Sequence, residues 1–152
     1  MNAAGFDCGP TLTSKCNYLE VALSDDANIW CGLRNNNVAN SAGTAIGTGY
    51  RNTIAIVDAG CSPSVAATAR AINAGGLTDW YLPSTAELTA LRSTKSALDR
   101  MPSLTGARGP KYYWSSTRAT QDASALYYSF DTGQISTGAS NYSRSVRPIR
   151  AF

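Results

Sequence analysis

The second half of the chain carries side chains that suit noncovalent recognition better than covalent chemistry. Tyrosine supplies rigid contact area, serine and asparagine supply adaptable hydrogen bonds, and arginine supplies charge with several donors. Such residues recur at the outward positions of the expected distal strands and in the loops between them. The candidate ligand-binding residues are Ser116, Thr117, Arg118, Asp122, Ser124, Tyr127, Ser129, Asp131, Asn141, Tyr142 and Arg144. The alternative for each of them is an ordinary solvated sheet face.

Catalysis has few candidates. The sequence contains no histidine, which removes the usual catalytic triads and imidazole acid–base chemistry. The glutamates are Glu20 and Glu87, and Glu87 is expected to cap a helix. We therefore expect no enzymatic activity.

Cofactors are not expected either, although two groups of oxygen-bearing side chains exist. Asp25, Asp26 and Asn28 could gather around a calcium ion, and so could Asp122 and Asp131. Neither group has the spacing of a known calcium loop. Exposed turn residues account for both groups without a metal.

The cysteines favour disulfides over a metal site. Cys8, Cys16, Cys31 and Cys61 form an even set without a Cys-x-x-Cys pair, and histidine is missing as a zinc ligand. We expect Cys8 to pair locally with Cys16, and Cys31 to pair with Cys61 across the intervening loop. Such bridges imply an oxidising compartment or a virion surface. The alternative is four reduced, buried cysteines in a cytosolic protein.

Composition and charge indicate a single globular domain without nucleic-acid or membrane partners. The chain has 152 residues, of which 43% are hydrophobic. Its formal charge of +3 comes from 13 basic and 10 acidic side chains that are scattered along the sequence. No basic stripe predicts nucleic-acid binding, and no apolar run approaches the roughly 18 residues of a membrane span. A signal peptide is not evident, which fits a module of a longer surface protein or a viral fibre tip.

The first half predicts one strand followed by helices. Residues 17–23 are rich in β-formers and predict a strand, while residues 33–50 predict an irregular loop. A helix is expected over residues 52–59. A second helix should begin with Ser62 as its cap and Pro63 at its first position, and the glycines at 75–76 should stop it.

A third helix follows from a capping box. Ser84 and Glu87 have the required spacing, so each side chain can bind the other residue's backbone N–H group. Leu88, Leu91 and Leu98 then line one face of the expected helix.

The distal part changes to a period of two. Leu126, Tyr128 and Phe130 should face the core, while the residues between them face solvent. Residues 131–134 supply a turn, and further strands are expected from residue 134 and over residues 143–150. The fold class is therefore α+β, with two to three helices and antiparallel distal strands. Trp80 and Trp114 are expected to be core residues whose indole N–H groups bind loop carbonyls.

Blocks in order across nearly the whole chain resemble the collagen-like adhesin (Lcl-type) C-terminal domain family. They are YLEVA at 18–22, WC at 30–31, TAIGTG at 44–49, NT at 52–53, GGLTDWYLPS at 75–84 with EL at 87–88, YWSS at 113–116 and VRPIR at 146–150. The resemblance implies a C-type-lectin-like fold related to formylglycine-generating enzymes. In that fold, residues 18–23 and 146–150 would pair as the first and last strands.

The same resemblance implies a role in adhesion at a bacterial or phage surface. The expected partners are a host-surface glycan or protein, together with a possible homotrimer on a stalk, in an extracellular, cell-surface or virion setting. One alternative is a structural trimerising tip without a receptor. Another is a copper-dependent cysteine oxidase, which would need a reactive thiol pair, yet all four cysteines precede residue 62 and lie outside the sheet-rich half.

Overall fold

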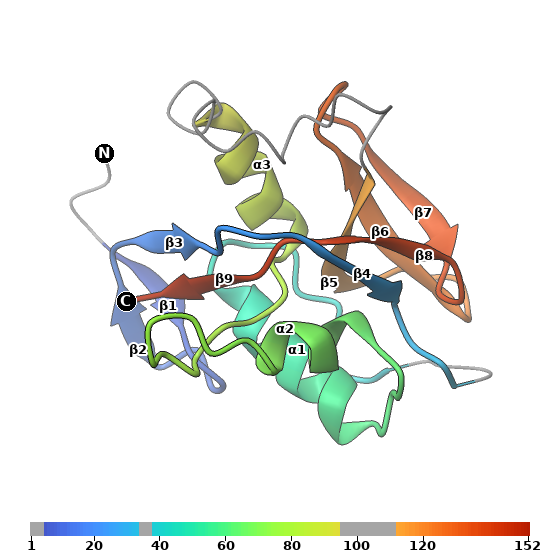
Figure 1. Ribbon diagram of the computed structural model, residues 1–152, viewed down its shortest axis with the longest axis horizontal. Helices are drawn as coiled ribbons and strands as arrows, with labels where there is room; N and C mark the ends of the chain where they lie inside the picture. Colours follow the sequence, from blue (N-terminus) through green and yellow to red (C-terminus); the bar gives the residue numbers. More distant parts are fainter. Residues whose placement is uncertain (1–4, 34–37, 95–111) are drawn as a thin grey trace.

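The computed structural model describes residues 5–33, 38–94 and 112–152 (Figure 1). Its elements, in chain order, are β1 (Phe6–Cys8), β2 (Ser14–Cys16), β3 (Leu19–Val21), β4 (Asp26–Ile29), α1 (Thr48–Asp58), α2 (Val65–Arg70), α3 (Thr85–Ser93), β5 (Tyr112–Arg118), β6 (Ser124–Ser129), β7 (Ile135–Ala139), β8 (Ser143–Val146) and β9 (Ile149–Ala151). This composition confirms the α+β class with three helices.

The described strands form two small sheets and one larger sheet. β1 pairs with β2, β3 pairs with β9, and the five-stranded sheet has the order β4-β8-β5-β6-β7. All pairings are antiparallel except the one between β5 and β8. Leu19 lies opposite Ala151 and Val21 lies opposite Ile149, so the expected pairing of the first and last segments is confirmed.

The strand expected over residues 143–150 is instead two strands. β8 pairs with β4, and β9 pairs with β3. Arg147 and Pro148 lie between these two strands and belong to neither. Pro148 has no N–H group to donate to a ladder. Arg147 is fully buried, and its guanidinium donates to Asp25 and to the carbonyl of Ala22 at 2.8 Å. These contacts hold the segment between the β4–β8 ladder and the β3–β9 ladder.

Helix α1 begins earlier than expected, within the segment that was predicted to be a loop. Gly47 precedes it with a φ of 92°, which favours glycine. A Cβ atom on Gly49 would lie 2.3 Å from Glu87 Oε2 and 2.7 Å from the Tyr81 ring. The glycine-rich sequence therefore serves close packing between α1 and the start of α3, which sequence pattern alone does not show.

Helix α2 is capped by Ser64, so the prediction of Ser62 as its cap is wrong. The Ser64 side chain accepts a hydrogen bond from the Ala67 N–H at 3.1 Å, and Pro63 lies outside the helix. The Pro63 carbonyl accepts from the Gly32 N–H at 3.1 Å. The helix ends at Arg70, before the glycines at 75–76. The start is thus shifted by a contact with a distant segment.

Helix α3 confirms the predicted capping box. Ser84 Oγ accepts from the Glu87 N–H at 3.3 Å, and Glu87 Oε2 accepts from the Ser84 N–H at 2.7 Å. Leu88 and Leu91 are buried as expected. Leu98, the third predicted member of this face, lies outside the described residues.

Glu87 also joins the beginnings of two helices. Its Oε1 accepts from the Gly47 N–H before α1 at 2.8 Å and from the Tyr81 hydroxyl at 3.1 Å. Burial raises the pKa of Glu87 above its usual value, although its hydrogen bonds with Ser84, Gly47 and Tyr81 oppose that rise. Burial, followed by the charge of Glu87, raises the pKa of Tyr81, which therefore remains a donor.

Glu87→Gln should lower the free energy of unfolding by about 1–3 kcal/mol, because the new amide brings two N–H donors beside the N–H groups of Ser84 and Gly47, where a protonated carboxyl brings only one O–H donor. The native state keeps the Glu87 proton to higher pH than the unfolded chain does, since burial raises the pKa of this carboxyl. Its stabilising effect is thus largest below the ordinary pKa and declines as pH rises through the native pKa. Urea unfolding should be measured for wild type and Glu87→Gln at about pH 4 and about pH 8. The difference in their free energies of unfolding should be smaller at the higher pH. A difference that widens would contradict this account.

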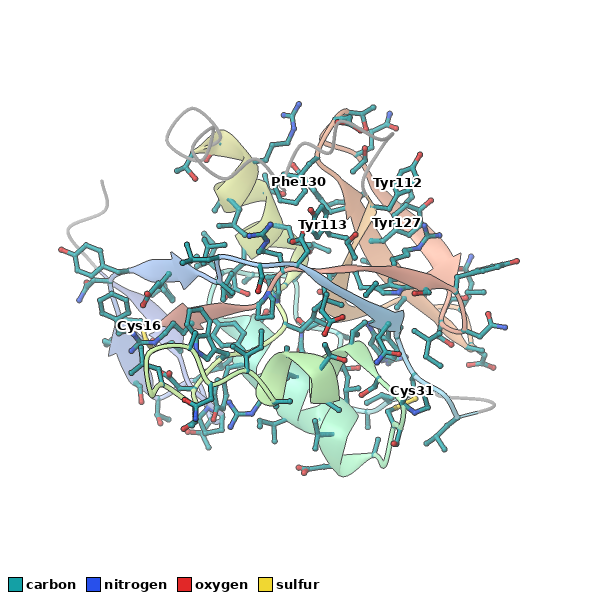
Figure 2. All side chains as sticks on the ribbon, viewed as in Figure 1. Cys16, Cys31, Tyr112, Tyr113, Tyr127 and Phe130 are labelled. Carbon is teal, nitrogen blue, oxygen red and sulfur yellow. A yellow bond between two sulfur atoms is a disulfide. The ribbon has the colours of Figure 1, made fainter. Side chains whose placement is uncertain are left out.

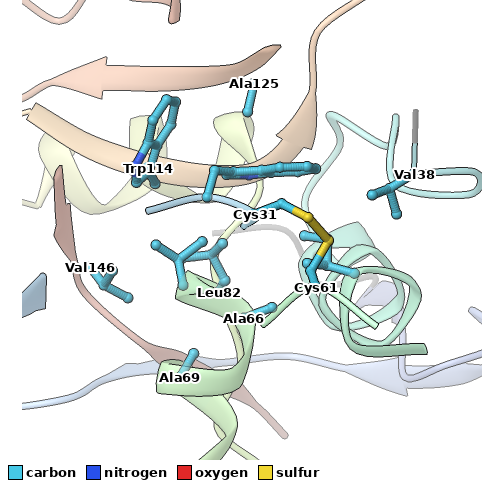
Figure 3. Close-up of a cluster of buried hydrophobic side chains, with 12 residues drawn as sticks. Cys31, Val38, Cys61, Ala66, Ala69, Leu82, Trp114, Ala125 and Val146 are labelled. Carbon is cyan, nitrogen blue, oxygen red and sulfur yellow. A yellow bond between two sulfur atoms is a disulfide. The ribbon is translucent and has the colours of Figure 1, made fainter. Parts of the chain in front are cut away.

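Both predicted disulfides are confirmed. Cys8 is bonded to Cys16, and Cys31 is bonded to Cys61. The second bridge lies in a buried cluster between the five-stranded sheet and helices α1 and α2 (Figure 3). It ties the segment before the first helices to the end of α1.

The five-stranded sheet is covered on both faces. Trp114 packs in the cluster of Figure 3 together with Trp30 and Leu82. Its neighbour Tyr113 points the other way, into a cluster with Phe130 and with Leu88 of α3. Side chains on both faces of β5 are therefore buried, including those of the polar residues Ser115, Ser116 and Thr117.

The indole N–H groups follow the prediction only in part. The Trp114 N–H donates to the Tyr142 carbonyl at 3.1 Å, as expected for a loop acceptor. The Trp30 N–H donates to the Ser115 carbonyl at 2.8 Å. Trp80 is buried, but its N–H finds no acceptor among the described residues. For Trp80, the predicted burial is therefore confirmed, whereas the predicted carbonyl acceptor is wrong.

Candidate recognition surface

Three aromatic rings surround one arginine on the distal sheet. The guanidinium carbon of Arg144 lies 3.7 Å from the ring centroid of Tyr127, 4.9 Å from that of Trp114 and 5.5 Å from that of Tyr112. These distances lie within the range of cation–π attraction. Figure 2 shows Tyr112 and Tyr127 together on the distal sheet, with Tyr113 and Phe130 closer to α3. We call these four residues, Arg144, Tyr112, Trp114 and Tyr127, the aromatic–arginine cluster.

Strand register brings the cluster together. Trp114 of β5 lies opposite Tyr127 of β6. Tyr113 lies beside Ser145 of β8, so Arg144 shares a face with Trp114 by alternation. Arg144 can extend across the sheet because β7 carries a glycine there, and a Cβ atom on Gly138 would lie 2.9 Å from Arg144 Nη2.

The Arg144 guanidinium is oriented but has no acceptor. It forms no hydrogen bond or ion pair with any described residue, and its Nε atom is buried. An arginine side chain carries five N–H donors in a fixed geometry. The rings therefore hold a set of unused donors in place, which suits a ligand that supplies oxygen acceptors.

Exposed tyrosines extend this surface. Tyr112 is 39% exposed and Tyr142, in the turn between β7 and β8, is 63% exposed. The neighbouring Asn141 is also exposed. Tyr142 is joined to the cluster through its backbone carbonyl, which accepts from Trp114.

Three predicted site residues do not face solvent. Ser116, Thr117 and Ser129 are at most 5% exposed, so their assignment to an outward face is wrong. The Thr117 hydroxyl donates to the Gly43 carbonyl at 2.8 Å. The register of β5 against β6 shifts between Trp114 and Arg118, so Ser116 and Thr117 lie in an irregular part of the ladder.

Asn52 of α1 holds this covered end of β5 in place. Its amide donates to the Gly43 carbonyl at 2.7 Å and to Ser116 Oγ at 3.2 Å. The loop that carries Gly43 therefore covers Ser116 and Thr117, which were predicted to face solvent. Nothing in the local sequence reveals this cover, because Asn52 and Ser116 are far apart in the chain.

The other predicted residues are distributed around the sheet. Arg118 and the buried Thr117 line a hollow of about 250 Å³, whose other walls include Leu126 and Thr137. Asp122 is exposed and Ser124 is half-buried near the turn before β6, whereas the exposed Asp131 follows the other end of that strand. Of the predicted set, the structure thus brings together Tyr127, Arg144 and Tyr142.

The candidate calcium oxygens are used within the chain. Asp25 accepts from Arg147 and from the Tyr113 hydroxyl, and Asp26 accepts from the Ala27 N–H. The Asn28 oxygen accepts from the Ile29 N–H. Asp122 and Asp131 are separated by the length of β6. Within the described ranges, no group of three histidine, cysteine, aspartate or glutamate residues is placed to hold a metal ion.

The sequence prediction missed Tyr112 and Gly138. Tyr112 could have been found, because it is two residues from Trp114 and therefore on the same strand face. Trp114 was expected to be a core residue, and it is fully buried, yet its ring also supports Arg144. No local signal identifies Gly138, whose importance depends on the position of Arg144.

Comparison with known proteins identifies the family. No helix among the described residues is long and apolar enough to cross a membrane. No curated protein sequence matches the chain significantly. The profile of the Lcl C-terminal domain matches residues 29–150. Because this match covers most of the sequence, the chain belongs to the Lcl C-terminal domain family.

Proposed function

We propose that the chain is a non-enzymatic recognition module that acts in adhesion at a bacterial or phage surface by binding a host-surface glycan. Family membership indicates a surface- or adhesion-related module. The observation that carries the ligand proposal is the aromatic–arginine cluster, in which Arg144 has no acceptor in the described part of the chain. The cluster is supported from below by the buried ring of Trp114.

A glycan matches the chemistry of this surface. Sugar hydroxyls can accept from the Arg144 donors, and tyrosine hydroxyls can both donate and accept. The exposed parts of Tyr112 and Tyr142 supply rigid rings that can pack against the C–H groups of a sugar. Such contacts require little ordering of the protein, because Tyr112 and Arg144 are already held by the sheet.

A C-type-lectin-like fold fits this proposal. In support, strand β3 near the start of the chain pairs with the last strand, β9, and the helices pack beside the five-stranded sheet. The candidate surface lies on the later strands of that sheet. An oxidase of the copper-dependent type lacks support, since its reaction needs a thiol pair and all four cysteines of the sequence are bridged.

A structural assembly role is the second candidate. It is favoured by an apolar cavity of about 480 Å³ whose walls include Phe6, Leu19, Ile46 and Leu91. Tyr18 also contributes to this cavity and is 66% exposed. This face could contact a neighbouring copy, as in a trimeric tip, and analytical ultracentrifugation would detect such an assembly.

Arg144→Ala and Tyr142→Ala should each weaken glycan or cell-surface binding by more than about 1 kcal/mol, because arginine and aromatic anchors dominate interface energies. Tyr127→Ala should do the same. The thermal midpoint should change little for Tyr142→Ala, since its ring is exposed. Binding should be measured on a glycan array and on intact host cells.

Tyr18→Ala is the matched control, because Tyr18 is as exposed as Tyr142 but packs against Phe152 instead of adjoining the aromatic–arginine cluster. It should bind normally. Normal binding by the Arg144, Tyr142 and Tyr127 variants, or an equal loss in the Tyr18 variant, would contradict the proposed surface.

A further inference from the structure

The five-stranded sheet ends in two edge strands that differ in how their backbone groups are protected. β4 and β7 are the outer strands of the order β4-β8-β5-β6-β7 (Figure 1). An edge strand presents unpaired N–H and C=O groups that can pair with another chain. Proteins usually block such edges with charges, proline or local hydrogen bonds.

The β4 edge is blocked by its own side chains. The Ala27 N–H donates to Asp26 Oδ1 at 2.7 Å, and the Ile29 N–H donates to Asn28 Oδ1 at 2.9 Å. The Asn28 amide in turn donates to Thr68 of α2 at 3.0 Å. An incoming strand would find these β4 donors occupied.

Among the described residues, nothing protects the β7 edge in this way. The Ser129 N–H donates to Gln134 and the Ser140 N–H donates to Ala123, so even-numbered residues direct their polar groups toward β6. The backbone N–H and C=O groups of Ile135 and Thr137 therefore point away from β6, and no described residue binds these groups.

The sequence around β7 likewise contains nothing that would repel a partner strand. Residues 132–143 include no charged residue and no proline. Ile135 is 47% exposed on this strand. Edge strands of this type are the usual templates for strand addition.

The two faces beside β7 differ in chemistry. On one face, the Arg144 guanidinium reaches the strand at Gly138, where no described residue accepts its hydrogen bonds. On the other face, Thr137 and Leu126 line the hollow of about 250 Å³. Side chains of an added strand alternate between these faces. A residue opposite Gly138 would meet Arg144, and its neighbours would lie on the side of the hollow.

We propose that β7 binds an extended segment of a partner protein as a sixth strand of the sheet. The segment carries an acidic side chain opposite Gly138 that pairs with Arg144, and small apolar side chains at the alternate positions. Main-chain hydrogen bonds to Ile135 and Thr137 supply affinity, while the two faces supply specificity. This partner differs from the glycan proposed above and binds along the edge of the sheet, although both ligands use Arg144.

The test uses a labelled peptide, Ac-Thr-Val-Glu-Val-Thr-Val-Thr-NH2, and fluorescence anisotropy with the intact chain. Its glutamate lies opposite Gly138 when its first two valines lie opposite Ala139 and Thr137. We expect saturable binding, and binding at least about tenfold weaker when lysine replaces the glutamate. Failure of the glutamate peptide to bind overturns the proposal.

Backbone methylation of the peptide separates strand addition from side-chain contact. N-methylation of the valines removes N–H groups that face β7 and should abolish binding. N-methylation of the glutamate removes an N–H that faces away, so most of the binding should remain. Equal effects of the two modifications overturn the proposal.

Two protein variants locate the edge. Ile135→Lys should reduce peptide binding by about tenfold or more, because edge lysines oppose strand addition. Val57→Lys, which makes the same change at a 39% exposed residue of α1, should not. Equal binding by both variants overturns the proposal.

Glycan binding distinguishes this inference from the proposed function. Ile135→Lys should leave glycan-array and host-cell binding intact, because Ile135 is not in the aromatic–arginine cluster. If the variant loses glycan binding while the peptide fails to bind wild type, the edge serves a glycan and the inference is wrong. If the peptide binds as expected but no glycan does, the proposed function fails alone.

Discussion

Replacing Arg147 with methionine should lower the free energy of unfolding by about 3–5 kcal/mol, because removal of one partner leaves the other charge of a buried pair uncompensated. Arg147 is fully buried and donates to Asp25 and to the Ala22 carbonyl. Asp25 would keep the Tyr113 hydroxyl as a donor, at 2.8 Å, but would lose the Arg147 guanidinium. Urea unfolding monitored by tryptophan fluorescence measures the loss.

Arg150→Met is the control for this prediction. Arg150 also binds two carboxylates, those of Glu20 at 2.8 Å and Asp79 at 3.1 Å, but both partner side chains are 46% exposed. Exposed ion pairs contribute about 0–1 kcal/mol to stability, so the free energy of unfolding of Arg150→Met should be close to that of wild type. A second variant that combines Arg147→Met with Asp25→Asn should recover part of the loss, since it also removes the unpaired charge. Equal stability of the two single variants would contradict the role of Arg147.

The position of Arg147 also bears on recognition. β8 carries Arg144, whose side chain lies over the aromatic rings, and Arg147 anchors the chain immediately after this strand. The buried contacts of Arg147 therefore fix the strand that presents the unused donors of Arg144. A rigid element positions such a group more accurately than a loop does.

Phe130→Ala should lower the free energy of unfolding by about 3–5 kcal/mol, because it removes a buried ring and leaves a cavity. Phe130 is 1% exposed, and its ring centroid lies 4.9 Å from that of Tyr113 and 5.2 Å from that of Tyr128. Its backbone carbonyl also accepts from Arg92 of α3 at 3.0 Å. Loss of the ring should therefore loosen α3 from the sheet, as hydrogen exchange of the α3 amides would detect.

Phe152→Ala provides the matched control, since Phe152 is 53% exposed. This variant should lose far less stability than Phe130→Ala, although Phe152 contacts Tyr18 at 5.7 Å between ring centroids. Comparable losses in the two variants would mean that the cluster between α3 and the sheet is not a principal source of stability.

Features that depend on neighbouring residues were predictable from the sequence. The capping box of Ser84 and Glu87 lies within a single helical turn, so its hydrogen bonds follow from spacing. The burial of Tyr128 and Phe130 follows from the pleat of a strand. The disulfides could be paired because Cys8 and Cys16 are separated by a short loop, which left Cys31 and Cys61 for each other.

Features that depend on distant segments were not predictable from local pattern. Helix α1 starts at Thr48 and packs closely against Glu87 at Gly49, and Asn52 contacts both Gly43 and Ser116. The sequence by itself determined the helix cap, the bridges, the α+β class and the chemical types at the distal surface, since each follows from adjacent covalent geometry or composition. Only the tertiary structure decided which of those residues meet, because cross-strand register and burial arise from contacts between segments far apart in the chain. Arg144 became the centre of the surface in that way, and Ser116, Thr117 and Ser129 became buried.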